Sequence, residues 1–544
     1  MSPIIIDGYF EGSFTKKRAQ NGTGKGSTQG GQCTLSTCFA QWPTPIVDLC
    51  DVASVTTIDV LPEVALLKIF DFCMDKTWIE VWHTLAHVCR EWRNVVFGSP
   101  RHLDLRLHCQ ASTPVRKTLD IWPAFPIIIM VHGHEMWGNW GVDNIIAALE
   151  HNDRICEISI WPVPSLQMEK VLAAMERPFP ALTILRLQPE DETVPVVPAS
   201  FLGGSAPHRP HPHLQTFFLD RIPFPGLPKL LLSATHLVQL NLWRIPHSGY
   251  FSPEVLVTGL SVLTRLRTLG IGFESPQSRP DQRNRRPPPP QTRTLLPVLV
   301  GFEYRGVGEY LEDLMARIDA PQLDDLAITL FHQLIFNTSQ LTQFIGRTPK
   351  LRAHNEARVA ISDLDVSVTL SRTFDEVFSQ IRLAISCKQP DWQLSSLAQV
   401  CSSSFPQALI TVVESLVILE ESGLRPHLQD DSDIENSQWL DLLHPFAAVK
   451  DLYIYPEFVP RIAPVLQELV GESVTEVLPA LRALQFREPP SGSVQEAIGQ
   501  FVAARRLAGH PIAVFQWPVR EKNSSLIIDM CSLFLSHFMF RAIY

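Results

Sequence analysis

The sequence predicts an α/β protein in which a small all-helical unit precedes a solenoid of short strands and helices. Three observations lead to this fold class. An apolar triplet recurs along most of the chain, apolar residues follow a helical period between residues 58 and 96, and helix-like segments separate the triplets. The chain has 544 residues. That length exceeds one ordinary compact core and agrees with an elongated array of repeats.

Composition excludes several classes of function before any motif is considered. Hydrophobic residues make up 45% of the chain and charged residues 19%, which is an ordinary globular balance. The formal net charge of −10 favours neither nucleic acid nor a membrane surface as a partner. The 10 cysteines are scattered without a CxxC pair, and no secretory signal is apparent. We therefore expect an intracellular protein of the cytoplasm, the nucleus or both, without a zinc site.

The two ends of the chain are expected to lie outside the folded core. Residues 1–45 are predicted to form a disordered arm, because Gly, Ser, Thr, Gln and Lys dominate residues 11–37 and cannot offset the entropy of ordering. Residues 511–544 are predicted to form a C-terminal tail. Charged or polar residues, Asp529 among them, interrupt its apolar stretch. That stretch is too short for the roughly 20 residues of a membrane span.

Residues 46–100 are predicted to form the helical unit. Pro62 suits the first turn of a helix because it has no N–H to leave unpaired, and Glu63 complements the positive end of the helix dipole. A second helix start follows at Thr77, with Glu80 three residues later in the spacing of a capping box. Apolar residues lie on more than one side of these segments, so the unit should be covered on more than one side.

This helical unit resembles the F-box. It has Leu-Pro-Glu-Val at 61–64, Ile-Phe at 69–70 and Val-Cys-Arg-Glu-Trp-Arg at 88–93, and residues 95–105 are similar to the form common in fungal F-box proteins. The resemblance implies that the unit binds a Skp-type adaptor. The residues expected to make or support that contact are Leu61, Pro62, Leu66, Ile69, Phe70, Val88, Cys89 and Trp92.

Residues 101–510 are predicted to form the solenoid. Each triplet has an apolar residue, a second three positions later and a third two positions after that. Successive copies begin between 23 residues (Leu214 to Leu237) and 33 residues (Leu266 to Leu299) apart, which fits the leucine-rich-repeat signature with loop insertions. The last two apolar positions should face inward from a short strand, and stacked strands bury a continuous core. Clear copies begin at Ile155, Leu182, Leu214, Leu237, Leu266, Leu299 and Leu323, and less regular ones at Val413, Val449 and Leu481.

Helices are expected between the triplets, which would place the strands on the concave side of the array. Residues 351–404 break the rhythm, and the pattern predicts no structure for them. The helix that begins at Ser493 should end near Gly509. The other predicted helices are Ser165–Glu176, Ser252–Thr264, Gly308–Ile318, Thr338–Arg347 and Ile434–Phe446.

Two histidine clusters do not point to metal chemistry. His132 and His134 lack the HExxH spacing that places two ligands on one helical face. His208, His211 and His213 alternate with prolines that prevent a helix. Each cluster is interpreted as a surface loop, and no metal ligand is predicted.

A basic, proline-rich loop is predicted near residues 276–294, where arginines precede Pro287–Pro290. It is interpreted as a disordered insertion, with docking through polyproline II as the alternative. The chain shows no glycine-rich phosphate loop, no GxSxG elbow and no nucleophile with a plausible partner. We therefore expect no catalytic residue and no cofactor.

The F-box resemblance implies a substrate-recognition subunit of a cullin–RING (SCF-type) ubiquitin ligase, which joins an adaptor and cullin scaffold to a protein substrate. The alternative is a leucine-rich-repeat scaffold without a ligase role. A hydrolase would need a concave pocket with perturbed titrating groups. Trp243 and Arg244, expected just beyond a strand, are the predicted substrate contacts, because Trp and Arg most often dominate binding energy. Trp243 could instead cap the repeat core.

Overall fold

The structure is a computed structural model whose chain divides into two compact units, Met1–Val60 and Leu61–Tyr544. All described residues belong to the second unit. The predicted arm, residues 46–60, most of the proline-rich loop and most of the C-terminal tail lie outside the described residues. The described ranges are 61–76, 88–98, 105–111, 115–121, 124–132, 141–203, 213–276, 292–333, 338–352, 354–362, 365–373, 379–387, 390–403, 407–420, 436–469, 474–490 and 492–516.

The predicted helical unit contributes two described helices, α1 (Glu63–Lys76) and α3 (Arg90–Gly98). The carbonyl of Pro62 accepts hydrogen bonds from the amides of Ala65 (2.8 Å) and Leu66 (3.1 Å), so Pro62 caps α1. The segment 77–87, which holds the predicted capping box, lies outside the described residues.

One sheet of 16 strands dominates the described part of the second unit. Its spatial order is β1-β2-β3-β4-β5-β6-β7-β9-β11-β14-β13-β12-β15-β16-β17-β18. Every neighbouring pair is parallel except the two that include β13. The strands up to β11 are β1 (Leu105–His108), β2 (Ile127–His132), β3 (Ile155–Val163), β4 (Ile184–Pro189), β5 (Thr216–Asp220), β6 (Gln239–Ile245), β7 (Thr268–Phe273), β9 (Gly301–Gly306) and β11 (Asp325–Phe331). The later strands are β12 (Glu356–Ile361), β13 (Asp365–Ser371), β14 (Ile381–Ser386), β15 (Ser415–Glu420), β16 (Asp451–Ile454), β17 (Ala483–Phe486) and β18 (Ala513–Gln516).

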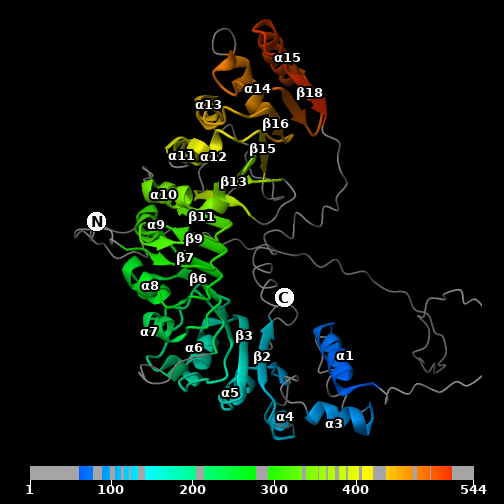
Figure 1. The fold of residues 1–544 in the computed structure, drawn as a ribbon, viewed down its shortest axis with the longest axis vertical. Coiled ribbons are helices and arrows are strands. Elements are labelled where there is room, and N and C mark those ends of the chain that lie inside the picture. Colours follow the sequence, from blue (N-terminus) through cyan, green and yellow to red (C-terminus); the bar gives the residue numbers. More distant parts are fainter. Residues whose placement is uncertain are drawn as a thin grey trace, which may run out of the picture. The chain divides into compact units, whose positions relative to one another are not determined.

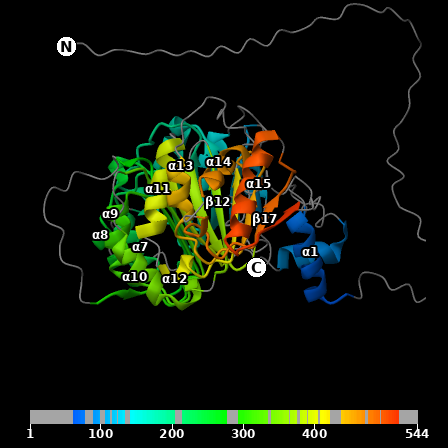
Figure 2. The ribbon, with the colours of Figure 1, turned by 90° about the horizontal axis from the view of Figure 1, so that it is seen from above.

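Helices follow most of the strands along the chain, and Figure 1 shows α6 to α10 along one side of the strands. In the view from above (Figure 2), α8, α9 and α11 lie to one side of β12. The helices predicted between the triplets are present, and their observed ends lie within a few residues of the predicted ones. The helices are α4 (Val115–Ile121), α5 (Val142–Leu149), α6 (Ser165–Ala174), α7 (Leu227–Ser233), α8 (Pro253–Leu260), α9 (Gly308–Met315), α10 (Ser339–Arg347), α11 (Pro390–Ser403), α12 (Gln407–Ile410), α13 (Asn436–Leu443), α14 (Val459–Glu468) and α15 (Gly492–Leu507).

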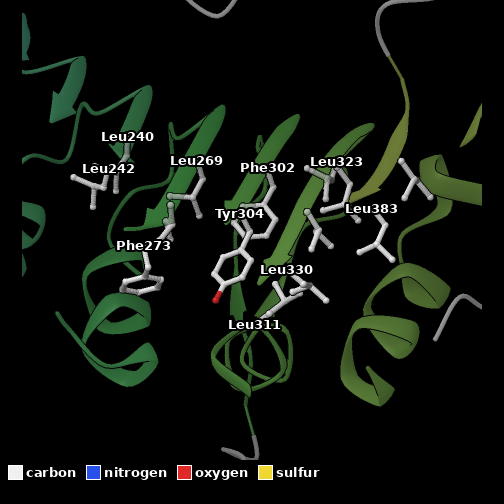
Figure 3. Packing of buried hydrophobic residues seen from close by; sticks show 14 of the residues in the cluster. Leu240, Leu242, Leu269, Phe273, Phe302, Tyr304, Leu311, Leu323, Leu330 and Leu383 are labelled. Carbon is white, nitrogen blue, oxygen red and sulfur yellow. The ribbon is translucent and has the colours of Figure 1, made fainter. Parts of the chain in front are cut away.

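The core lies between the sheet and the helices. Figure 3 shows Phe273, Tyr304 and Leu330 extending from the strands toward the helix that carries Leu311. Each predicted triplet enters a strand, with its first residue just before the strand or at its start and its last two residues in it. The residues predicted to be nearly fully buried, which are Leu185, Leu240, Leu269 and Leu326, are 0–1% exposed. The structure is thus a mixed α/β repeat array, as the periodicity predicts.

The segment with no predicted structure reverses the order of the strands. From β11 the chain passes through α10 to β12, three places further along the sheet, and then returns through β13 and β14 to fill the gap. β13 pairs antiparallel with both neighbours. Antiparallel neighbours need only a short turn, whereas parallel ones need a crossover, so the spacing of the triplets disappears here.

Two predicted boundaries need correction. The solenoid was expected to end at residue 510, but β18 extends the sheet to Gln516 by parallel pairing with β17. The proline-rich loop was expected to run to residue 294, but Thr294 already lies in β8 (Thr294–Leu295), which pairs with β10 (Ile318–Asp319). β18 and β8 are short, and neither carries the apolar triplet.

A buried arginine ties the last helix to the preceding repeat. Arg505 of α15 is 0% exposed. Its guanidinium donates to four backbone carbonyls, those of Val474 (2.9 Å), Leu478 (3.4 Å), Pro479 (3.2 Å) and Leu481 (3.2 Å). Burial lowers the pKa of Arg505. The side chain therefore fixes α15 to the segment that leads into β17.

Candidate functional site and interaction surfaces

The first candidate surface is a group of exposed apolar side chains on the helical unit. Leu61 is 39% exposed, Val64 67%, Ile69 40% and Val88 54%. On α1 the residues Ile69 and Val64 lie on the two flanks of Phe70, about 100° and about 120° around the helix from it, because each residue advances by 100°. An apolar group that stays at the surface of a small helical unit is typical of a contact site.

The remaining predicted adaptor residues hold the unit together. Leu66 and Phe70 are buried, at 4% and 0% exposure. The rings of Phe70 and Trp92 lie 4.9 Å apart and are tilted by 59°. Cys89 caps α3, because its Sγ accepts a hydrogen bond from the amide of Trp92 at 3.4 Å. The structure therefore divides the eight predicted residues into an exposed group, with Pro62 beside Leu61, and an inner group.

The second candidate surface is the face of the sheet opposite the helices, which we call the open face. Alternation along a strand places residues between two core positions on this face. Arg186, Phe218, Asn241 and Gly270 each lie between the last two apolar positions of a triplet, and the pairing register aligns them in one row across β4 to β7. Ala327 of β11 continues that row. Most of these side chains are half-buried by their neighbours rather than free, and Phe218 is only 9% exposed.

Trp243 lies within β6, not beyond it as predicted, and its indole covers two glycines of the next strand. A Cβ placed on Gly270 would lie 2.7 Å from Cζ2 of Trp243. A Cβ placed on Gly272 would lie 2.8 Å from Cζ3 of the same ring. Only glycine at both positions allows the indole to lie flat on the open face, where Trp243 remains half-exposed.

Arg244 is a structural residue rather than a free contact. Its guanidinium forms a two-pronged ion pair with Asp220, and the Nε–Oδ1 distance is 2.6 Å. The hydrogen bond to Asp220 raises the pKa of Arg244. The backbone of Arg244 has a positive φ of 47°, next to a register shift between β6 and β7. The side chain is thus engaged in positioning this irregular end of β6, and its predicted substrate contact stays a prediction.

Glu303 on β9 is a candidate site residue that the sequence analysis missed. It pairs in register with Gly270 of β7. Burial and, to a smaller extent, the neighbouring Asp325 raise the pKa of Glu303 to about 7, while Arg382 acts in the opposite direction. A glutamate between the core residues Phe302 and Tyr304 was the available signal in the sequence.

Other charges near this part of the sheet are paired with one another. Arg186 lies 3.9 Å from Glu157 on β3. Arg221 lies 3.5 Å from Glu274, and its Nη1 donates to the carbonyl of Asp191 at 2.8 Å. These contacts neutralise charge across β3 to β7, so Glu303 differs from the acids around it.

Asp191 organises the start of α6. Its carboxylate accepts hydrogen bonds from the amide and hydroxyl of Ser165 and from the amide and hydroxyl of Thr193, at 2.9 Å for the Ser165 amide and 3.1 Å for the Thr193 amide. These donors, those of Ser165 first, lower the pKa of Asp191 to about 2. This acid caps a helix and is not a catalytic candidate.

The described residues offer no arrangement typical of metal or hydrolytic chemistry. Among them no group of three or more His, Cys, Asp or Glu side chains could hold a metal ion. A hollow of about 180 Å³ is lined by aromatic and small residues, including Ser275, with no acid or base to activate that hydroxyl. Both predicted histidine loops lie largely outside the described residues. In the described ranges no helix has both the length and the apolar character that crossing a membrane requires.

Comparisons with known proteins leave the family open. No protein-family model matches the chain, and no curated protein matches it. Among solved structures the chain is similar to the leucine-rich repeat-containing protein LegL7 from Legionella pneumophila, at 10% identity. That likeness covers 73% of this chain and 97% of LegL7, with a TM-score of 0.25. At this TM-score the likeness adds nothing to the strand order and register described above.

Proposed function

We propose that this chain is a substrate-recognition subunit of a cullin–RING (SCF-type) ubiquitin ligase. The observation that supports the proposal most directly is the exposed apolar group at Leu61, Ile69 and Val88, which are 39%, 40% and 54% exposed. These residues belong to the stretch that resembles the F-box. A surface of this kind loses water-exposed apolar area when a partner covers it, which favours binding.

In this proposal the Skp-type adaptor contacts Leu61, Pro62, Ile69 and Val88, while the inner residues of the unit keep α1 and α3 together. The repeat array binds the protein substrate on its open face. The chain itself carries out no chemical step. It acts by proximity, because holding a substrate lysine near a charged conjugating enzyme raises the effective concentration of the two groups.

Adaptor binding is the test. We expect the triple substitution Leu61→Ala, Ile69→Ala and Val88→Ala to weaken binding to a purified Skp-type adaptor by at least about tenfold, since each truncation removes apolar contact area that the proposal assigns to the adaptor. Isothermal titration calorimetry measures the affinity. Circular dichroism and the melting temperature should stay close to wild type, because all three side chains are exposed.

A matched control removes exposed apolar side chains elsewhere. Leu166 on α6 is 76% exposed and Val255 on α8 is 40% exposed. Their replacement by Ala should leave adaptor affinity unchanged. If the triple variant binds the adaptor as tightly as wild type, the assignment of the surface is wrong. If wild-type chain does not bind the adaptor at all, the scaffold without a ligase role becomes the better explanation of the repeat array.

A further inference from the structure

The open face holds a flat aromatic surface beside a lone carboxylate. β7 lies between β6 and β9, and its residues Gly270 and Gly272 leave room for the indole of Trp243. Gly270 pairs with Glu303 on its other side. Neighbouring strands are roughly 5 Å apart. The indole of Trp243 and the carboxylate of Glu303 therefore flank the same glycine, with no side chain of β7 between them.

Glu303 is not committed to a partner of its own. Among the described residues, no hydrogen bond or ion pair reaches its carboxylate. The guanidinium of Arg305 on the same strand lies over the ring of Phe331, 5.8 Å from its centroid, and so turns toward β11 and away from β7. By contrast, Asp220 nearby is fully engaged by Arg244. One acid on this part of the open face thus has Arg382 as a nearby cation but no hydrogen bond or ion pair with it.

We propose that the indole of Trp243 and the carboxylate of Glu303 together bind a basic side chain, lysine or arginine, of the protein held on the open face. A cation gains energy over the face of an indole, and Trp is the best of the aromatic residues for this contact. One face of the Trp243 ring rests on the two glycines, and a basic side chain would lie against the other. The carboxylate supplies the charge partner. This inference rests on the proposed function and narrows its substrate to a segment with a basic residue.

The protonation of Glu303 predicts how binding of a basic side chain depends on pH. The charged groups that face Glu303 are Arg305 on β9, Asp325 on β11 and Arg382 on β14, and β7 contributes none. With the pKa of Glu303 at about 7, a bound cation favours the ionised carboxylate and expels its proton. Binding should therefore strengthen from pH 6 to pH 8, by up to ~10-fold if only the ionised form binds.

The experiment uses the full chain and a fluorescein-labelled decalysine peptide, followed by fluorescence anisotropy in 0.15 M NaCl at pH 6 and pH 8. We expect Glu303→Gln to lose the gain in affinity at pH 8. We expect Trp243→Ala to weaken binding at both pH values. Gly272→Ala is a second route to the same site, because its methyl group would meet the indole of Trp243 first and displace it without changing any charge. The matched control is Glu309→Gln, which removes an exposed acid from α9.

The outcomes separate specific binding from attraction to an acidic protein. If Glu309→Gln weakens binding as much as Glu303→Gln does, or if wild-type chain does not bind decalysine, the inference is overturned. A pH dependence that persists in Glu303→Gln also overturns it. Adaptor binding is measured on the same variants and should remain at the wild-type level. If the wild-type chain does not bind the adaptor, that result counts against the proposed ligase role alone.

Discussion

Arg505 offers a sharp test of how the end of the array is held together. Replacing Arg505 with Met keeps the length and apolar stem of the side chain but removes the guanidinium. The carbonyls of Val474, Leu478, Pro479 and Leu481 then lose their buried donor. A buried carbonyl without a partner costs about 1–3 kcal/mol. Removing the guanidinium also removes the cost of burying its charge, which offsets part of that loss. Relaxation and water entry recover part of the loss, so we expect a net destabilisation of about 2–5 kcal/mol.

Hydrogen exchange measures this effect locally, which matters because a repeat array need not unfold in one step. Exchange should accelerate in β17, β18 and α15 of the Met variant and remain unchanged in β3 to β7. Arg505→Lys is the matched control, since it keeps the charge but cannot direct donors to four carbonyls at once. It should show an intermediate effect. Wild-type exchange throughout the Met variant would refute the reasoning.

Two further predictions concern acids with opposite pKa shifts. Asp191→Asn should destabilise the protein by about 1–2 kcal/mol near neutral pH. Because the pKa of Asp191 is lowered from 3.8 to about 2 in the folded protein, the difference in stability from wild type should be constant above pH 5 and vanish as the pH falls through 2. Urea titrations at several pH values measure this difference. Glu303→Gln should stabilise the protein by at most about 3 kcal/mol at pH 8 and hardly at all at pH 4. Its folded pKa is raised from 4.5 to about 7, so the wild-type cost appears as the pH rises through that interval, and melting curves with equal shifts at both pH values would contradict this.

The array was predictable where one physical requirement repeats. Leu185, Leu240 and Leu326 lie at the same step of successive triplets, and each fills the same layer between strand and helix. The reversal at β12 to β14 was not predictable, because a hairpin needs no fixed spacing between strands. A pattern of apolar residues reports which face is buried, but it does not report which strand lies beside which.

The site was predictable only in part, for reasons visible at three residues. Trp243 stays a predicted substrate contact, and its flat position depends on glycines in the next strand, which no signal within β6 reveals. The ion pair of Arg244 could not be predicted because its partner Asp220 is 24 positions away, and the substrate contact of Arg244 stays a prediction. Glu303 was missed because its raised pKa comes first from burial in the assembled sheet and then from Asp325 on β11. Each of these properties arises from pairing between strands.

The reversed strands also bear on how the protein reaches its folded state. In a parallel array each new strand finds a finished edge beside it, so order can spread from one end in steps of a single repeat. β11 has no such successor, because the next strand in the chain, β12, lies three places away and must wait for β13 and β14 to close the gap. The strands before and after the reversal are therefore expected to behave as separate cooperative blocks, each able to melt while the other persists. A destabilising change in β17 should lower the stability of β15 and β16 but leave the stability of β14 and the strands before it in the sheet unchanged.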